Sequence, residues 1–189
     1  MSRVEILWGD LRAIEPTREE LYACSAALSE GYNDPANAEL MGHSSLISPR
    51  EVVDSYEQSI AEGMRAFLFF VGDAFAGDGD LRNFKSASAE FAFMITTPAA
   101  QGKGLGTRFA TMLHAFGFLQ LELARIYASV VPHNTASRRV FEKLGYLVDD
   151  SPAGRAYAEE PGDVTLSLPR KSFIATHARL LDEIRIGVR

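Results

Sequence analysis

Residues 97–107, TPAAQGKGLGT, constrain the fold of this chain more than any other segment, because they join an apolar strand to a helix. The residues before them, 89–96 (AEFAFMIT), are apolar on both faces after Glu90, which is typical of a strand inside a sheet. The residues after them, 107–123, place apolar side chains at helical spacing. Three glycines in the join let the backbone bend sharply and let a ligand approach it closely. The sequence therefore predicts a strand–loop–helix unit with room for a ligand at the loop.

The charge and spacing of this loop favour a phosphate or pyrophosphate as its ligand. The first turn of a helix has unpaired N–H groups and a partial positive charge, and Lys103 adds a full charge. Two common templates do not fit. A Walker loop requires Ser or Thr where Gly104 stands, and a dinucleotide-binding loop requires glycine where Thr107 or Phe109 stands. A plain glycine-rich turn stays open as the alternative.

Local signals predict several element boundaries. Capping boxes at residues 17–20 and 48–51 mark the starts of two helices. The first helix is expected to stop near Gly31, because glycine is common just after a helix, and residues 31–47 are expected to form a long, broken connection. Residues 73–79 are expected to hold a turn, with Ala74 to Ala76 as a candidate start of the next strand.

Two motifs, taken together, resemble those of the Gcn5-related N-acetyltransferase family. The first, residues 101–106 (QGKGLG), matches the family's Gln/Arg-x-x-Gly-x-Gly/Ala signature after its fourth strand. The second, residues 134–146 (NTASRRVFEKLGY), looks like the family's Asn-x-x-Ser/Ala block that ends in Glu-Lys-Leu-Gly-Phe/Tyr. The resemblance covers residues 65–150. Its Asn-to-Ser spacing and the stretch from Asp80 to Glu90 look closest to the ribosomal-protein N-terminal acetyltransferase-like branch.

The resemblance implies an α/β (α+β) fold that forms a single GNAT-type N-acetyltransferase domain over residues 1–189. Its sheet is then mixed and mostly antiparallel, splays between the fourth and fifth strands, and has helices on both faces. The sequence places those two strands at 89–96 and 125–131. The helical spacing of apolar residues also predicts a C-terminal helix over 172–186.

The resemblance further implies that acetyl-CoA lies in the splay as a co-substrate, and that no metal is used. Backbone groups at the end of the fourth strand would pair with the pantetheine arm as if it were an added strand. The glycine loop would hold the pyrophosphate, Asn134 would contact the pantetheine end and Phe141 would flank it. Asn134 also fits a plain helix cap. The residues implied for cofactor binding are Met94, Ile95, Thr96, Gln101, Gly102, Lys103, Gly104, Leu105, Gly106, Thr107, Asn134 and Phe141.

In this family an amine attacks the thioester directly, so a base, an oxyanion donor and an acid are expected. The donor is expected to be a backbone N–H near Met94 or Thr96. Many relatives have a tyrosine acid where Phe141 stands, and phenylalanine has no proton to donate. The hydroxyl of Ser137, one turn earlier, is the candidate replacement. A thiol with a pKa of about 8.5 also leaves without strong help.

The base is less clear, because some relatives have a glutamate where Ser129 stands. Glu90, at the start of the fourth strand, and His133, at the end of the fifth, are the candidates, with His43 as a weaker third. Each has a structural alternative: Glu90 fits a solvated charge at a strand end, and His133 fits a surface loop histidine.

Residues 149–163 (DDSPAGRAYAEEPGD) place five carboxylates against one arginine, beside the acceptor site that the resemblance implies. An acidic rim attracts a cationic amine. The sequence thus favours a positively charged small-molecule or peptide acceptor: a basic peptide N-terminus, a polyamine or an aminoglycoside-like amine. A solvated acidic loop is the structural alternative, and an inactive acyl-CoA-binding sensor module is the functional one.

The composition of the chain argues against nucleic-acid and membrane partners. The chain has 19 Lys and Arg against 25 Asp and Glu, a net charge of −6, which argues against a nucleic-acid binder. The single cysteine, Cys24, excludes an internal disulfide and a cysteine-based zinc site, and no apolar run reaches the length of a membrane span. We therefore expect a cytoplasmic protein without nucleic-acid or membrane partners, with homodimerisation left open.

Overall fold

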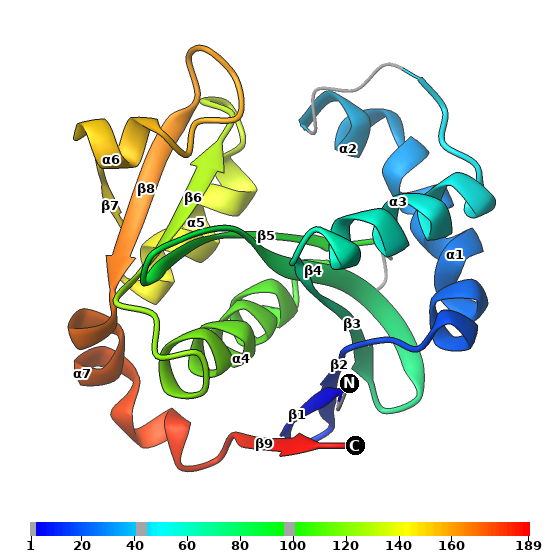
Figure 1. Cartoon of the computed structure of the whole chain (residues 1–189), viewed down its shortest axis with the longest axis horizontal. Coiled ribbons are helices and arrows are strands. Elements are labelled where there is room, and N and C mark those ends of the chain that lie inside the picture. Colours follow the sequence, from blue (N-terminus) through cyan, green and yellow to red (C-terminus); the bar gives the residue numbers. More distant parts are fainter. Residues whose placement is uncertain (1–2, 41–44, 97–100) are drawn as a thin grey trace.

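The computed structural model describes residues 3–40, 45–96 and 101–189. Within these residues the strands form one sheet in the order β7-β8-β6-β5-β4-β3-β2-β1-β9 (Figure 1). The strands are β1 Val4–Trp8, β2 Leu11–Ile14, β3 Arg65–Val71, β4 Ala74–Lys85, β5 Ser88–Ile95, β6 Arg125–Val130, β7 Leu147–Val148, β8 Val164–Pro169 and β9 Arg185–Val188. The helices are α1 Arg18–Asn33, α2 Pro35–Leu40, α3 Pro49–Ala61, α4 Leu105–Leu119, α5 Thr135–Leu144, α6 Pro152–Arg155 and α7 Arg170–Leu181.

The two faces of the sheet bury two separate apolar clusters, because side chains alternate along each strand. On β3, Phe67 and Phe69 belong to the cluster that packs against α4, whereas Ala66 and Leu68 belong to the cluster under α1 and α3. Figure 1 shows α4 on one side of β4 and β5 and α3 on the other. The mixed, mostly antiparallel sheet with helices on both faces is therefore confirmed.

The expected splay is also present. The fourth and fifth strands of the sequence prediction are β5 and β6, which form the parallel pair of this sheet; the other pairs described are antiparallel. Their pairing covers three positions, from Ser88 opposite Arg125 to Glu90 opposite Tyr127. Beyond Glu90 the two strands diverge, so the end of β5 has β4 as a partner on one edge and an open edge on the other (Figure 1).

Both capping boxes start helices as predicted. Thr17 Oγ1 accepts the Glu20 N–H at 3.2 Å while Glu20 accepts the Thr17 N–H at 2.8 Å, and Ser48 with Glu51 repeats the pattern at α3. α1 ends at Asn33, slightly beyond the stop predicted near Gly31. Part of the connection that was expected to be irregular forms α2.

The predicted turn over residues 73–79 is too long: the chain reverses at Gly72 and Asp73, β4 begins at Ala74 as allowed for, and the strand runs straight through the glycines at 77 and 79. A Cβ at Gly77 would lie 2.1 Å from the Met94 carbonyl oxygen, and one at Gly79 would lie 2.9 Å from that of Ala92. Glycine therefore allows β4 and β5 to approach closely here. The signal from these two glycines therefore reflects interstrand spacing, whereas the chain reversal lies just before Ala74.

The C-terminal prediction is correct for the helix and wrong for its end. α7 stops at Leu181, and residues 185–188 form β9, which pairs with β1 at the far edge of the sheet. The Trp8 indole donates to Glu183 at 2.9 Å in the connection between them. Among the described residues, no helix has the length and apolar character needed to cross a membrane.

Close packing of α1 against β5 gives a test of this arrangement. Gly31 lies against Thr96, and a Cβ at Gly31 would be 2.7 Å from Thr96 Cγ2. Gly→Ala inside an open helix stabilises by roughly 0.5–1 kcal/mol. We expect the opposite sign for Gly31→Ala, a free energy of unfolding lowered by about 1–3 kcal/mol, because the added methyl overpacks the contact. Urea unfolding measures this, with Ala26→Gly at an exposed α1 position as the propensity control. A stabilised Gly31→Ala variant would contradict the packing.

Candidate active site

The glycine loop leads into a helix whose N-terminus is open. Gly102 and Gly104 have φ of +73° and +75°, the left-handed region that glycine favours. Gly104 is the N-cap of α4, and among the described residues no side chain caps the first turn. A Cβ built at Gly104 meets no described atom within 4 Å. Lys103 is exposed beside it. Unpaired N–H groups, open space and a nearby cation together suit a phosphate group.

The end of β5 offers every second backbone group to the splay. The Thr96 N–H donates to the Ala76 carbonyl on β4 at 3.0 Å, and Met94 pairs with β4 two positions back. Directly opposed residues in an antiparallel pair alternate between bonded and unbonded, so Met94 and Thr96 direct their N–H and C=O groups toward β4. Ile95 directs its groups toward the splay, and its carbonyl accepts from the Gln101 amide at 3.0 Å.

This alternation corrects the expected oxyanion donor. The N–H groups of Met94 and Thr96 are committed to β4, so neither is available at the open edge. The N–H groups that face the splay belong to Phe93 and Ile95. For the same reason Ile95 can pair with an added strand at this edge, whereas Met94 and Thr96 cannot.

The second motif forms the start of α5. Asn134 is the N-cap, and its Oδ1 accepts the Ser137 N–H at 3.0 Å, so the cap is in place. Ser137 is half-buried in the first turn. The Phe141 ring is 3% exposed and packs edge-on against Phe91 and Phe93, with centroids 6.1 and 6.0 Å away. Phe141 therefore belongs to the apolar core behind the splay.

Three carboxylates lie on the face of β4 and β5 that α1 and α3 cover, and we call Asp78, Asp80 and Glu90 the acidic row. The register places Asp78 opposite Leu68 and Asp80 opposite Ala66, both members of the apolar cluster under these helices. Asp78 is 6% exposed and Glu90 is 2% exposed. The reading of Glu90 as a solvated strand-end charge is therefore wrong.

Phenols and amides hold the acidic row at both ends. The Tyr32 hydroxyl on α1 donates to Asp78 Oδ2 at 2.7 Å, and the Tyr56 hydroxyl on α3 donates to the same oxygen. At the other end, Asn83 Nδ2 donates to Glu90 Oε2 at 2.6 Å. Asn83 adopts a φ of +50° at an irregularity in the β4–β5 pairing, which turns its amide toward Glu90.

Two oxygens of the acidic row accept no hydrogen bond from the described residues. Within residues 3–40, 45–96 and 101–189, neither Asp78 Oδ1 nor Asp80 Oδ1 has a hydrogen-bond donor. Burial raises the pKa of Asp78 to about 6 and that of Asp80 to about 7, against an ordinary value of 3.8. Burial also raises the pKa of Glu90. Buried carboxylates without hydrogen-bond donors are costly, so a cationic donor that reached these oxygens would be stabilised there.

Arg82 links the acidic row to the segment before β8. Its guanidinium lies 2.6 Å from Glu159 Oε1 and 3.7 Å from Glu90 Oε1, and its Nε lies 3.7 Å from Asp80 Oδ1. One arginine therefore forms ion pairs with three carboxylates, and Asp78 is a fourth acidic group on the same face. The local charge is strongly negative when all four are ionised.

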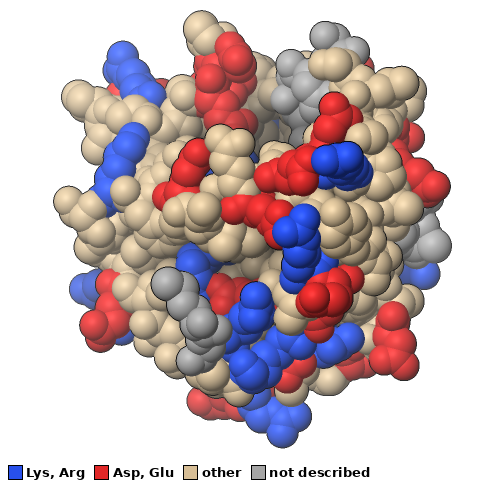
Figure 2. Space-filling model, turned by 45° about the vertical axis from the view of Figure 1, so that its right-hand side comes forward, with Lys and Arg blue, Asp and Glu red and all other residues tan. Residues whose placement is uncertain are grey.

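The acidic segment, residues 149–163, is held against the sheet. Tyr157 stacks on Tyr127 of β6 with centroids 4.3 Å apart, and its hydroxyl lies 2.9 Å from Ser88 Oγ. Lys85 lies over the Tyr157 ring at 4.4 Å. The reading as a freely solvated loop is therefore wrong for its central part. Figure 2 shows Asp and Glu side chains gathered on the upper part of this face, with Lys and Arg mostly lower down.

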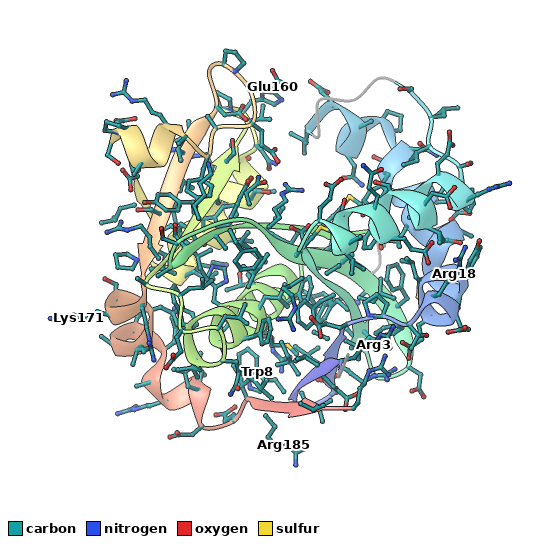
Figure 3. All side chains as sticks on the ribbon, in the orientation of Figure 1. Arg3, Trp8, Arg18, Glu160, Lys171 and Arg185 are labelled. Atoms are coloured by element: carbon teal, nitrogen blue, oxygen red, sulfur yellow. The ribbon has the colours of Figure 1, made fainter. Side chains whose placement is uncertain are left out.

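Ser129, which stands where some relatives have a glutamate base, anchors this segment. Its hydroxyl donates to Asp163 Oδ2 at 2.8 Å and accepts the Glu159 N–H at 3.0 Å. Its hydroxyl is therefore occupied by structural contacts. Glu160 lies at the tip of the segment, at the top of the view in Figure 3.

The structure places the candidate base His133 at the surface. Its side chain is 60% exposed, and Nε2 lies 3.8 Å from Glu39 of α2, a contact that is ionic only when the imidazole is protonated. His43, the weaker candidate, lies outside the described residues. His114 is buried between the Ala110 carbonyl and the Tyr146 hydroxyl, which makes it a core residue.

Sequence reasoning missed Asp78, Asp80, Arg82 and the two phenols. The signal was present in residues 77–82 (GDGDLR), where charged side chains alternate within a strand. Aspartate is depleted in strands, so two at alternate positions on a buried face is unusual. The glycines between them suggested a turn and concealed the pattern.

With this geometry in place, comparison with known proteins identifies the family. A model of the acetyltransferase (GNAT) domain matches residues 11–147. The chain belongs to the GNAT acetyltransferase family. The matched range contains the glycine loop, the splay, the acidic row and the start of α5.

Individual relatives match this chain over a shorter stretch or at lower sequence identity. Spermidine N(1)-acetyltransferase of Escherichia coli strain K12 is 39% identical over 61 residues, 32% of this chain and 32% of that protein. This chain thus spans about a third of the length of that curated relative. Mycobacterium smegmatis RimJ with CoA-disulfide has a TM-score of 0.71 at 19% identity, covering 96% of this chain and 93% of RimJ. Vibrio cholerae spermidine N-acetyltransferase with CoA and spermine has a TM-score of 0.68 at 18% identity, covering 87% and 98%. At these identities the structures share the fold.

The raised pKa values predict a specific pH dependence of stability. Between about pH 4 and pH 7 the folded chain keeps a proton on Asp80 that the unfolded chain has lost, so the free energy of unfolding falls as pH rises. Asp80→Asn cannot titrate. We expect its stability relative to wild type to increase by about 2–4 kcal/mol from pH 4 to pH 8, measured by urea unfolding. Asp54→Asn, at an exposed carboxylate of α3, is the control. A stability difference that is constant with pH would contradict the buried charge.

Proposed function

We propose that this chain transfers the acetyl group of acetyl-CoA to a cationic primary amine. The observation that carries the proposal is a pair of oxygens on β4, Asp78 Oδ1 and Asp80 Oδ1, that have no hydrogen-bond donor within the described residues and lie one strand in from the open edge of β5. An ammonium group has three donors and one positive charge, which are what two buried carboxylates lack. Spermidine, an acceptor named for two relatives, belongs to this class.

The donor side of the proposal rests on the open edge of β5 and the start of α4. Bound acetyl-CoA supplies the activated thioester. Gly102, Gly104 and Lys103 would hold its pyrophosphate, because they combine free backbone space with positive charge. Ile95 would pair with the pantetheine arm, and Asn134 would contact its far end.

The acceptor side rests on charge. The acidic row and Glu159 bring four carboxylates together, and Arg82 brings one positive charge. A cationic amine adds the missing charge and is steered toward the site by the acidic segment. A basic peptide N-terminus, a polyamine and an aminoglycoside-like amine all satisfy this requirement.

One observation favours a second function, an acyl-CoA-binding module without catalysis. Phe141 stands where many relatives have an acid, and its ring is buried in the core. A chain that binds acyl-CoA and lacks an effective acid would serve as a sensor. The readily departing CoA thiol makes the enzyme the better-supported reading.

An amine panel tests the enzyme against the module. Release of free CoA thiol is followed with spermidine, a basic peptide, an aminoglycoside and an uncharged aromatic amine. We expect turnover with cationic amines and at least a tenfold rise in their KM in Asp80→Asn, because one carboxylate of the ammonium site is removed. Asp54→Asn is the matched control. Normal acetyl-CoA binding with no turnover on any amine would favour the module.

A second variant tests the cofactor loop. Asparagine tolerates positive φ, so Gly104→Asn adds a side chain to the open space with little backbone strain. We expect acetyl-CoA affinity to fall at least tenfold by calorimetric titration, because the side chain occupies the space of the pyrophosphate. Gly72→Asn is the control, since Gly72 also has positive φ and open surroundings. Equal affinity in Gly104→Asn and wild type would show that the phosphate lies elsewhere.

A further inference from the structure

Tyr32, Tyr56 and Asp78 form a closed triangle of oxygens beneath α1 and α3. The two phenol oxygens lie 2.9 Å apart, Tyr32 lies 2.7 Å from Asp78 Oδ2, and Tyr56 contacts the same oxygen. All three groups come from different elements of the fold. Tyr22, the other tyrosine of α1, is 47% exposed and takes no part.

The triangle can be hydrogen-bonded in both protonation states of Asp78. When Asp78 is ionised, each phenol donates its one hydrogen to Oδ2, and the contact between the phenols has none. When Oδ2 is protonated, it donates to Tyr32, Tyr32 donates to Tyr56, and Tyr56 donates to Oδ2. A proton on Oδ2 therefore needs the rotation of the Tyr32 hydroxyl alone, because Tyr56 donates to Oδ2 in both states. A proton taken up at Oδ1 leaves both phenol donations to Oδ2 in place.

The second oxygen of Asp78, Oδ1, is buried and has no hydrogen-bond donor within the described residues. Tyr32 faces it from α1 and Tyr56 from α3, while Asp80 and Arg82 follow on β4 and Glu90 lies on β5. Arg82 lies nearer to the other carboxylates and to Glu159 than to Asp78 in the ion pairs described. With Oδ2 fixed by two phenols, Oδ1 keeps a single orientation on the face where the acceptor is proposed to bind.

We propose that Asp78 accepts the proton of the acceptor amine, and that Tyr32 and Tyr56 are positioning residues that hold it for this step. The proposal rests on the proposed function. The ammonium loses a proton to Asp78, directly or through one water, and its nitrogen forms the bond to the acetyl carbon. The carbon–sulfur bond breaks and its electron pair leaves on sulfur. Of the two protons lost before the amide forms, one goes to Asp78 and one to the CoA thiolate.

The phenols determine the pH at which this step operates. Their hydrogen bonds favour the ionised form and oppose the rise in the pKa of Asp78 that burial causes. Removing one phenol therefore raises the pKa of Asp78 further and leaves less carboxylate at neutral pH. We expect the acid limb of kcat/KM in Tyr56→Phe to move up by about one pH unit, roughly tenfold in rate on that limb, with little change at its alkaline plateau.

Three variants make the kinetic test. Tyr56→Phe and Tyr32→Phe are expected to shift the acid limb, Asp78→Asn to lower kcat more than 100-fold at every pH, and the exposed control Tyr22→Phe to match wild type. An equal loss in Tyr56→Phe at all pH values would overturn the positioning role. Substantial kcat in Asp78→Asn would overturn the proton-acceptor role.

A measurement without substrate separates this proposal from the proposed function. Carboxyl carbon resonances of protein labelled at aspartate are followed against pH, with Asp78→Asn used to assign the signal. We expect the Asp78 midpoint to rise in Tyr56→Phe and to stay in place in Tyr22→Phe. An unchanged Asp78 midpoint in Tyr56→Phe would contradict the positioning role of the phenols, even if amines are acetylated. A shifted midpoint without acetylation of any amine would contradict the proposed function alone.

Discussion

The early end of the β5–β6 pairing is the constraint on which the rest of the site depends. After three paired positions, β6 turns away with β8, and the last residues of β5 keep an open edge. Backbone groups without partners are costly in a protein interior, so such an edge is retained where something else pairs with it. The glycine loop follows this edge directly, which brings a helix N-terminus to the same place.

The acidic row lies close to this divergence but stays largely buried. α1 and α3 cover the face of β4 that carries it, and the Asp80 side chain keeps 14% exposure there. The acidic segment adjoins the row from the β8 side through Arg82 and Tyr157. Donor and acceptor features thus meet at one point because a single pair of strands separates there.

Much of the fold was predictable because its signals are local. Capping boxes at Thr17 and Ser48 depend on residues three positions apart. The glycine loop is likewise recognised from residues that are consecutive in the sequence. The acidic row was not predictable in the same way. Asp78 becomes buried only when β4 pairs with β3 and two helices from a distant part of the sequence close over it, and the glycines at 77 and 79 look like turn residues without β5 beside them. The surface position of His133 is the complementary case, since the sequence at a strand end gives no sign of how far the following side chain extends into solvent.

The anchoring of Tyr157 has a consequence for how an acceptor is chosen. Ordering a loop during binding costs conformational entropy, which weakens affinity for every ligand alike. Here the stacked ring, the Arg82 ion pair and the Ser129 hydrogen bonds already fix the acidic segment before any ligand arrives. Selection among amines then depends on the spacing of their charges against a rigid surface, as in a preorganised receptor, and not on their ability to draw a lid closed.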